Sequence, residues 1–336
     1  MRVLYIGQYS AGSTSRMRGE SLQTLLGAAS FEVIDVDEPI CQTNRLFRSF
    51  GWRYKSGPLI GNIETHIRNR INGHYDLVWV DKGIFLGASL VSAIKADIKV
   101  HYTPDTAIIF NQSRPFFESI PWYNYCITTK SFEIEAFKKK GAKEVLFCTQ
   151  GYDSAIHHPY HPFHEKEGIV FVGHYEEERE YILTKFLERK VKVKLAGSNW
   201  EKFARKYRTD NYLSYIGKGV YGNEYGSLIS KGQLGLGLLS KWFPERHTTR
   251  TLEIPACGTA LASERNEDTL SIFSEEEALL YNDSRELIEK ADFALKDPMY
   301  LEKLTQKGFL RVTKGEFEYL SILKSLLVQM KVVNAE

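Results

Sequence analysis

The chain has 336 residues, of which 43% are hydrophobic and 26% are charged, and its formal net charge is +2. This length favours two domains, and the apolar content is sufficient for two cores. Because domains that bind nucleic acid are as a rule strongly basic, the near-neutral charge argues against a nucleic-acid partner.

The cysteines and the apolar runs indicate a cytoplasmic protein. Cys41, Cys126, Cys148 and Cys257 form no C-x-x-C pair and have no metal-ligand spacing, so we expect reduced thiols. The apolar run at the amino terminus is too short for a signal peptide. No run approaches the length needed to span a bilayer.

The first half of the chain alternates short apolar runs with helical segments, which predicts a parallel sheet with right-handed crossovers. Strands are expected at residues 3–6, 31–36, 75–83, 98–105, 122–128 and 144–148. After the first strand, Gly12 and Ser13 lead into a helix that includes Arg16. No Lys-Ser/Thr pair follows this turn, so it is not a P-loop.

Residues 40–75 are basic and rich in aromatic side chains. Six lysines and arginines stand against the single acid Glu64, and the aromatic residues are concentrated in residues 45–55. Such a segment suits an anionic membrane surface or an acidic acceptor. The alternative is a partly ordered excursion with a solvated basic face.

Polar residues end the third and fourth predicted strands. Asp81 is followed by a Lys-Gly pair, and His101 precedes a Pro-Asp turn at Asp105. Because ligands of open α/β sheets bind at the carboxyl ends of the strands, Asp105, Asp81 and His101 are candidate ligand-binding residues. Ordinary turn chemistry is the alternative explanation for Asp105.

The same alternation restarts after residue 165, which predicts a second domain of similar type. Strands are expected at residues 168–173, 191–197, 213–217 and 233–240, with a further strand after Gly258. Four histidines precede this domain at positions 157, 158, 161 and 164, but prolines interrupt any helical ligand spacing, so we expect no metal.

The glycines at positions 217, 219 and 222 match G-x-G-x-x-G. A dinucleotide site would need an acidic residue about 20 positions further on, and Ser240 and Lys241 stand there instead. We therefore do not assign a dinucleotide to this loop.

Two glutamates, Glu245 and Glu253, follow the apolar run 233–240 at an E-x7-E spacing, with Arg250 between them. A helix is expected to begin near Thr248 or Thr249. Its first N–H groups and the arginine suit a phosphate, whereas the carboxylates suit hydroxyl groups. This combination predicts a ligand that is anionic in one part and polyhydroxylated in another, such as a nucleotide sugar.

The E-x7-E spacing followed by Ile254-Pro-Ala-Cys-Gly258 resembles the nucleotide-sugar site of retaining GT-B glycosyltransferases, in particular glycosyltransferase family 4. Residues 249–258 are similar to the spore-maturation CgeB-like branch. The resemblance implies an α/β protein of GT-B fold, with two Rossmann-like domains whose parallel sheets face across a cleft. It implies an acceptor-side domain at 1–160, a nucleotide-sugar domain at 161–312 and a carboxyl-terminal helix at 313–336 that packs back on the first domain.

The resemblance also implies roles for individual residues. Glu253 would hold the ribose diol, Glu245 the sugar hydroxyls, and Arg250 or Arg179 the diphosphate, assisted by the helix start at Thr248 and Thr249. The remaining donor-side candidates are Gly173, Gly217 and Lys218, together with Gly12 and Ser13. The acceptor-side candidates are Asp81, His101, Asp105 and Arg16.

The implied activity is transfer of a hexose-like sugar from a nucleotide diphosphate sugar to a hydroxyl group of a glycan or lipid-linked acceptor, with retention. No D-x-D stands in a suitable loop, so no metal and no cofactor are expected. Two alternatives remain open at this point. One is a nicotinamide-dependent oxidoreductase, and the other is a catalytically silent module that binds a sugar nucleotide or glycan.

Overall fold

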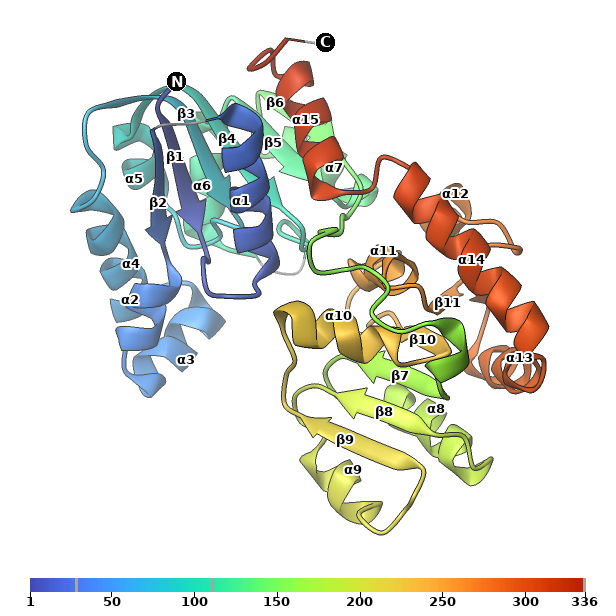
Figure 1. Ribbon diagram of the computed structural model, residues 1–336. Coiled ribbons are helices and arrows are strands. Elements are labelled where there is room, and N and C mark those ends of the chain that lie inside the picture. The colour runs from blue at the N-terminus through green and yellow to red at the C-terminus, as the bar shows by residue number, and fades with distance from the viewer. Residues whose placement is uncertain (28–29, 110–111, 335–336) are drawn as a thin grey trace. The chain divides into compact units, whose positions relative to one another are not determined.

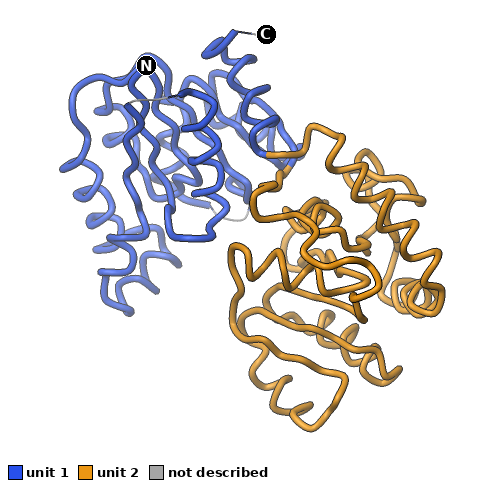
Figure 2. Tube along the Cα trace, viewed as in Figure 1, with its two compact units in different colours: residues 1–149, 319–336 blue, residues 150–318 orange. Residues whose placement is uncertain are grey.

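The computed structural model describes residues 1–27, 30–109 and 112–334. The chain forms two compact units, one from residues 1–149 and 319–336 and the other from residues 150–318 (Figure 2). From the sequence, these boundaries were expected after residues 160 and 312. No helix of the described residues is long and apolar enough to cross a membrane.

The first unit contains a six-stranded parallel sheet in the order β2-β1-β3-β4-β5-β6 (Figure 1). Its strands are β1 (Val3–Gly7), β2 (Phe31–Asp35), β3 (His74–Asp81), β4 (Lys95–Thr103), β5 (Tyr125–Thr128) and β6 (Glu144–Phe147). Its α-helices are α1 (Thr14–Leu26), α2 (Asp37–Gln42), α3 (Arg45–Tyr54), α4 (Pro58–Arg68), α5 (Ala88–Ala93), α6 (Arg114–Ser119), α7 (Ile134–Lys139) and α15 (Tyr319–Gln329).

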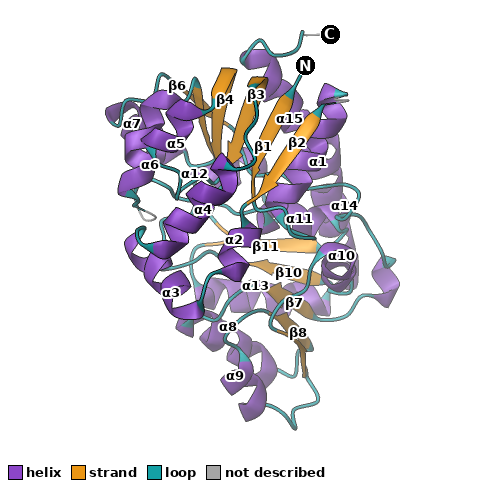
Figure 3. Ribbon diagram, turned by 90° about the vertical axis from the view of Figure 1, so that its left-hand side faces the viewer, coloured by secondary structure: helices purple, strands orange, loops and turns teal. Residues whose placement is uncertain are grey.

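Side-chain alternation along β1 decides which helices cover each face of this sheet. Leu4 and Ile6 point into a core with Ile63 and Ile67 of α4. Tyr5 points to the opposite face, where its hydroxyl donates to the carbonyl oxygen of Ser15 in α1 at 2.6 Å. The carboxyl-terminal helix α15 lies against α1 on this face, as the sequence resemblance implied (Figure 3).

The second unit contains a six-stranded parallel sheet in the order β12-β11-β10-β7-β8-β9. Its strands are β7 (Ile169–Val172), β8 (Val193–Ala196), β9 (Leu213–Gly217), β10 (Leu234–Gly237), β11 (Ala260–Glu264) and β12 (Leu279–Tyr281). Its α-helices are α8 (Glu177–Glu188), α9 (Glu201–Lys206), α10 (Gly222–Ser230), α11 (Arg250–Ala256), α12 (Glu267–Ile272), α13 (Ser284–Lys296) and α14 (Pro298–Lys314). The three-residue strand β12 was not predicted, because it is too short to show a periodic pattern.

Two cores cover the faces of this second sheet. Ile169 and Phe171 of β7 belong to a cluster with residues of α8, α13 and α14. Val170, between them, belongs to a cluster with residues of α10 and α11 on the opposite face. Each sheet is therefore buried on both faces, as parallel sheets usually are.

Each sheet has one place where the connections that leave two neighbouring strands run towards opposite edges of the sheet. In the first unit this switch point lies between β1 and β3, and in the second unit between β7 and β10. Loops that follow the two strands diverge there and leave their carboxyl ends uncovered, so this is where ligands of open α/β sheets bind.

The basic, aromatic-rich segment is helical rather than a partly ordered excursion. Asn44 caps α3 by accepting a hydrogen bond from the backbone N–H of Leu46 at 2.9 Å. Gly51 lets α3 approach α4 closely, since a Cβ at this position would lie 2.6 Å from the Cβ of Leu59. The helix exposes Leu46, Phe47, Phe50, Trp52 and Tyr54.

A buried ion pair links α1 to β3. Arg18 donates from Nε and Nη2 to the two carboxylate oxygens of Asp81, at 2.7 and 2.9 Å, and both side chains are fully buried. The Arg18 guanidinium also lies 4.8 Å from the ring centre of Tyr102. Although burial opposes its charge, Asp81 and Tyr102 raise the pKa of Arg18 well above its usual value.

Arg18→Met is expected to lower the free energy of unfolding by about 3–5 kcal/mol, because it leaves the Asp81 carboxylate buried without its partner. Urea denaturation measures the change. Arg16→Met is the matched control, since the Arg16–Glu20 pair is solvent-exposed and contributes at most about 1 kcal/mol. Equal effects of the two substitutions would contradict the assigned role of the buried pair.

Candidate functional site

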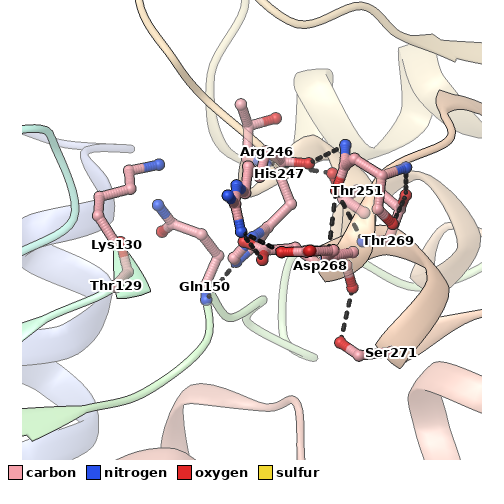
Figure 4. Close-up of polar contacts among 12 residues, drawn as sticks. Thr129, Lys130, Gln150, Arg246, His247, Thr251, Asp268, Thr269 and Ser271 are labelled. Atoms are coloured by element: carbon pink, nitrogen blue, oxygen red, sulfur yellow. Dashed lines mark hydrogen bonds and ion pairs between the residues drawn. The ribbon is translucent and has the colours of Figure 1, made fainter. Parts of the chain in front are cut away.

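The stretch between β10 and α11 is a loop fixed at its far end by His247. From the sequence, strand β10 was expected to reach residue 240, but it ends at Gly237. The Nδ1 of His247 lies 2.9 Å from the Oδ2 of Asp268, and its Nε2 accepts a 3.4 Å hydrogen bond from the backbone N–H of Gln150 (Figure 4). Because Nε2 accepts, the proton of the neutral ring is on Nδ1, where it donates to Asp268.

A second contact anchors the same loop to the start of α12. The side-chain amide of Asn266 donates to the carbonyl oxygen of Arg246 at 2.7 Å, and the Arg246 guanidinium pairs with Glu267 at 2.7 Å. Asn266 also begins α12 with a capping box that includes Thr269. The loop that carries Glu245 to the start of α11 is thus held at two neighbouring residues, Arg246 and His247.

Two arginines come together at the switch point between β7 and β10. Arg179, on α8 after β7, is buried and donates from Nη2 to the carbonyl oxygen of Leu238, just after β10, at 3.2 Å. Burial and the nearby positive charge of Arg250 lower the pKa of Arg179 to about 10. Arg179 remains protonated at neutral pH, so two positive charges stand in a partly desolvated position.

Two acidic side chains stand near this positive charge. Glu176 pairs with Arg179 at 3.2 Å and also lies 2.8 Å from the Nε2 of His174. Glu245, which is half-buried, also acts electrostatically on Arg179. Within the described residues, the buried Nε atoms of Arg179 and Arg250 have no hydrogen-bond partner. These two N–H groups are available to an anion.

The predicted helix start is in place. α11 begins at Arg250 with Thr249 as its N-cap residue, and the Thr249 side chain makes no capping hydrogen bond. Thr248 is buried, and its backbone N–H donates to the hydroxyl of Thr251 at 3.2 Å. Both threonines therefore lie directly beside Arg250.

Glu253 is buried on α11 and is held from two sides. The hydroxyl of Tyr225 on α10 donates to its Oε2 at 2.6 Å, and the Nε2 of His157 lies 3.8 Å from its Oε1. Burial and then the Glu253 carboxylate raise the pKa of Tyr225 well above its usual value, so Tyr225 is the donor. The arrangement leaves Glu253 acceptor capacity for further hydroxyl groups, because an ionised carboxylate takes about four hydrogen bonds.

The neighbouring histidines do not converge on one point. His158 stacks on Tyr160 with ring centres 4.1 Å apart, and His161 lies 3.3 Å from the hydroxyl of Ser227. His164 is exposed. In the described part of the chain, no three His, Cys, Asp or Glu side chains lie together in a way that could hold a metal ion.

The glycine candidates of this unit lie at or just after the carboxyl ends of its strands. Gly173 follows β7, and its carbonyl oxygen accepts from the indole N–H of Trp200 at 2.8 Å. Gly217 ends the edge strand β9 with a φ of 140°. The Lys218 side chain is exposed and pairs with Glu201 at 3.2 Å. Gly173 is therefore at the switch point, whereas Gly217 and Lys218 lie at the edge of the sheet.

Gly12, Ser13 and Arg16 lie at the start of α1 in the first unit. Gly12 has a positive φ of 77°, and the Ser13 hydroxyl caps α1 by accepting from the backbone N–H of Arg16 at 3.2 Å. The Arg16 side chain pairs with Glu20 at 2.7 Å. The local chemistry of these residues is that of a helix start.

The structure separates the strand-end candidates of the first unit. Asp105 is exposed and pairs with Lys82 at 3.2 Å, whereas Asp81 is neutralised by Arg18. Desolvation of the carboxyl group opposes its ionisation, but Lys82, Lys130 and Arg18 together lower the pKa of Asp105. His101 is fully buried, and its Nε2 lies 3.0 Å from the carbonyl oxygen of Lys82. Of the three, only Asp105 presents a charged group to solvent.

The positioning residues of this site were not predicted from the sequence. Tyr225 and His157 contact Glu253, and Asp268 contacts His247. One local sequence pattern could have indicated one of them: the N-x-x-T pattern at Asn266 predicts the helix cap next to Asp268.

Comparison with known proteins gives a family match over part of the chain and a fold for nearly all of it. Residues 179–327 match a family model described as glycosyl transferase-like. None of the curated proteins matches the chain. Among solved structures, HepE of Anabaena in complex with UDP and glucose is 12% identical, with a TM-score of 0.68 over 99% of this chain and 100% of HepE.

Two trehalose-6-phosphate synthase structures are also similar. The enzyme from Burkholderia multivorans is 9% identical, with a TM-score of 0.63 over 98% of both chains. A trehalose-6-phosphate synthase studied with bisubstrate glycomimetics for glycosyltransfer with retention is 10% identical, with a TM-score of 0.66 over 99% of both chains. The whole chain thus has the GT-B fold, and the fold class expected from the sequence is confirmed.

His101 is expected to make stability depend on pH. Burial lowers its pKa from 6.5 to about 4 in the folded protein, against the opposing effect of its hydrogen bond to the Lys82 carbonyl. Between these values the unfolded chain binds a proton that the folded protein does not. Stability from this residue is therefore fully present above about pH 6.5 and is lost as the pH falls towards 4, by about 3 kcal/mol in all.

Urea denaturation between about pH 7.5 and about pH 4.5 tests this effect. The loss of stability on acidification should be clearly smaller in His101→Gln than in the unsubstituted protein, whatever the stability of the variant at neutral pH. Parallel pH profiles would show that His101 does not titrate as described.

Proposed function

We propose that this chain, a glycosyltransferase of the GT-B fold, transfers a hexose-like sugar from a nucleotide diphosphate sugar to a hydroxyl group of an acceptor. The observation that carries the proposal is the convergence of Arg179 and Arg250 at the β7/β10 switch point, with Glu245 and Glu253 beside them. Cations for a diphosphate and carboxylates for sugar hydroxyls are thereby present in one place.

The arginines account for the anionic part of the donor. Arg179 and Arg250 repel each other across a partly desolvated site, and each has an unpaired buried Nε. A bound diphosphate would relieve this repulsion and accept both N–H groups. The same positive charge would stabilise the diphosphate as it leaves with additional negative charge.

The glutamates account for the hydroxyl groups of the donor. Glu253, held by Tyr225 and His157, would accept hydrogen bonds from the ribose diol. Glu245, at the half-buried end of the loop after β10, would accept from the hydroxyls of the transferred sugar. The backbone near Gly173 at the switch point and near Gly217 and Lys218 at the sheet edge would complete donor binding.

Similar structures favour a uridine nucleotide and a glucose-like sugar. HepE is solved with UDP and glucose and with UDP-glucose. The trehalose-6-phosphate synthase that was studied for transfer with retention supports the same stereochemical outcome for this chain.

In the proposed step, the bond between the sugar C1 and the diphosphate oxygen breaks, and a bond between C1 and the acceptor oxygen forms on the same face of the sugar. The proton of the acceptor hydroxyl passes to the departing diphosphate oxygen, so that charge and atoms balance. Asp105, ionised beside Lys82, would orient the acceptor hydroxyl by accepting its hydrogen bond. The step needs neither a metal nor a cofactor.

The acceptor we propose is a precursor of a cell-surface polysaccharide or a glycolipid, handled in the cytoplasm. Helix α3 supports contact with an anionic membrane surface. This helix carries Arg45, Arg48 and Arg53, and it exposes Phe47 and Trp52. Cationic and aromatic side chains together bind to the interfacial region of anionic bilayers.

The donor can be identified by thermal denaturation with UDP, GDP, ADP, CDP, NAD and representative sugar nucleotides, each with and without a chelator. A nucleoside diphosphate at about 100 times its dissociation constant should stabilise the protein by about 2.7 kcal/mol, and UDP is expected to do so without a metal. Stabilisation by NAD alone would point to an oxidoreductase. Donor binding without transfer or slow hydrolysis would point to a silent binding module.

Arg250→Ala and Glu253→Ala are each expected to lower kcat/KM for transfer by about 10- to 100-fold, because each removes a contact to the donor in the transition state. Arg285→Ala is the matched control, since Arg285 is exposed on α13 in the same unit and pairs only with Glu289. Near-normal turnover in both site variants would refute the proposed donor site.

A further inference from the structure

The first unit contains a pocket of its own. This cavity of about 120 Å³, which opens to solvent, lies at the carboxyl ends of β1 and β3. These strands form the switch point of their sheet, which is where open α/β sheets bind ligands. All of its lining residues belong to this unit, so the pocket is complete without the second one.

The polar groups of the pocket are confined to the strand ends. Asp81 lines it but is already neutralised by Arg18 through two hydrogen bonds. Lys82 and Asp105 form the remaining charged pair, at 3.2 Å, and both are accessible to solvent. At this end of the pocket, Lys82 can therefore donate a hydrogen bond to a ligand hydroxyl group, and Asp105 can accept one from it.

The other walls are apolar and come from the helices that follow β2. Ile40 of α2, Trp52 of α3 and Ile63 of α4 line the pocket, together with Phe85 after β3. Trp52 packs edge-on against Phe85 with ring centres 4.7 Å apart, yet 42% of its surface remains exposed. An oligosaccharide in this pocket would have to bury hydroxyl groups against these four side chains, of which only the Trp52 indole can donate a hydrogen bond, and such burial is unfavourable.

We propose that this pocket binds the apolar part of the sugar acceptor, so that the acceptor is an amphiphile with an alkyl-like chain rather than a free saccharide. The acceptor hydroxyl lies at the Lys82–Asp105 pair, and the chain lies along Trp52, Ile40 and Ile63. This assignment of the acceptor class rests on the proposed function. Ligand pockets commonly combine such apolar walls with a few placed polar groups.

The proposal is tested by isothermal titration calorimetry with methyl and octyl β-D-glucoside, both below the micelle concentration of the octyl compound. Each buried CH₂ group raises affinity up to about fourfold, so the octyl glucoside should bind the unsubstituted protein at least about tenfold more tightly. Trp52→Ala removes an apolar wall of the pocket, and Ile84→Trp fills its space. Each substitution should abolish most of this difference in affinity. The second variant keeps the test valid if the first is poorly folded.

Phe47→Ala is the matched control, because Phe47 is an exposed aromatic of the same helix and does not line the pocket. It should leave the preference for octyl glucoside unchanged. Equal affinity for both glucosides would overturn the pocket assignment. Equal losses of the octyl preference in Trp52→Ala and Phe47→Ala would also overturn it, because they would indicate adsorption to the surface of α3.

Binding of UDP, measured in the same samples, separates this inference from the proposed function. UDP binding without a preference for the octyl chain would overturn the acceptor class alone. A preference for octyl glucoside without nucleotide binding would overturn the proposed transferase function. The first unit would then still contain an apolar ligand site, but its ligand would not be a sugar acceptor.

Discussion

Parallel strands joined by right-handed crossovers impose the constraint on which both candidate sites depend. Each sheet is built outward in two directions from one pair of neighbouring strands, β1 and β3 in one unit and β7 and β10 in the other. Only at these pairs do the following loops diverge and leave the strand ends uncovered. The apolar pocket and the pair of arginines lie at these two places, so their positions follow from the topology before any particular side chain is considered.

The two switch points treat buried charge differently. In the first unit, Arg18 and Asp81 are fully buried and neutralise each other with two hydrogen bonds, which favours a rigid wall rather than a binding group. In the second unit, Arg179 and Arg250 stand close together, and Glu176 pairs with Arg179. The buried Nε atom of each arginine has no hydrogen-bond partner among the described residues, which suits a ligand that brings negative charge, as a nucleotide diphosphate does.

Positioning side chains explain how the site in residues 150–318 keeps its geometry. His247 is held between Asp268 and the backbone of Gln150, which fixes the loop just before α11. Tyr225 holds the carboxylate of Glu253 on α11 itself. The same short helix thus carries Arg250, which suits an anion, and Glu253, which suits hydroxyl groups. Contacts to neighbouring elements fix both the loop before this helix and the side chain of Glu253.

The sequence alone determined the alternation of strands and helices, because apolar runs and helical periodicity are local properties. It also brought Glu245, Arg250 and Glu253 together, since they are close in the chain and partly on one helix. Tertiary structure decided the rest. Arg18 meets Asp81 across 63 positions, and Tyr225 meets Glu253 across 28, which no local pattern encodes. His101 lies near the end of β4 and Asp105 lies just after it, but packing buries the ring of His101 against Phe116 while Asp105 reaches solvent. Burial depends on elements far apart in the chain, so only the folded protein separates a structural polar residue from a ligand-binding one.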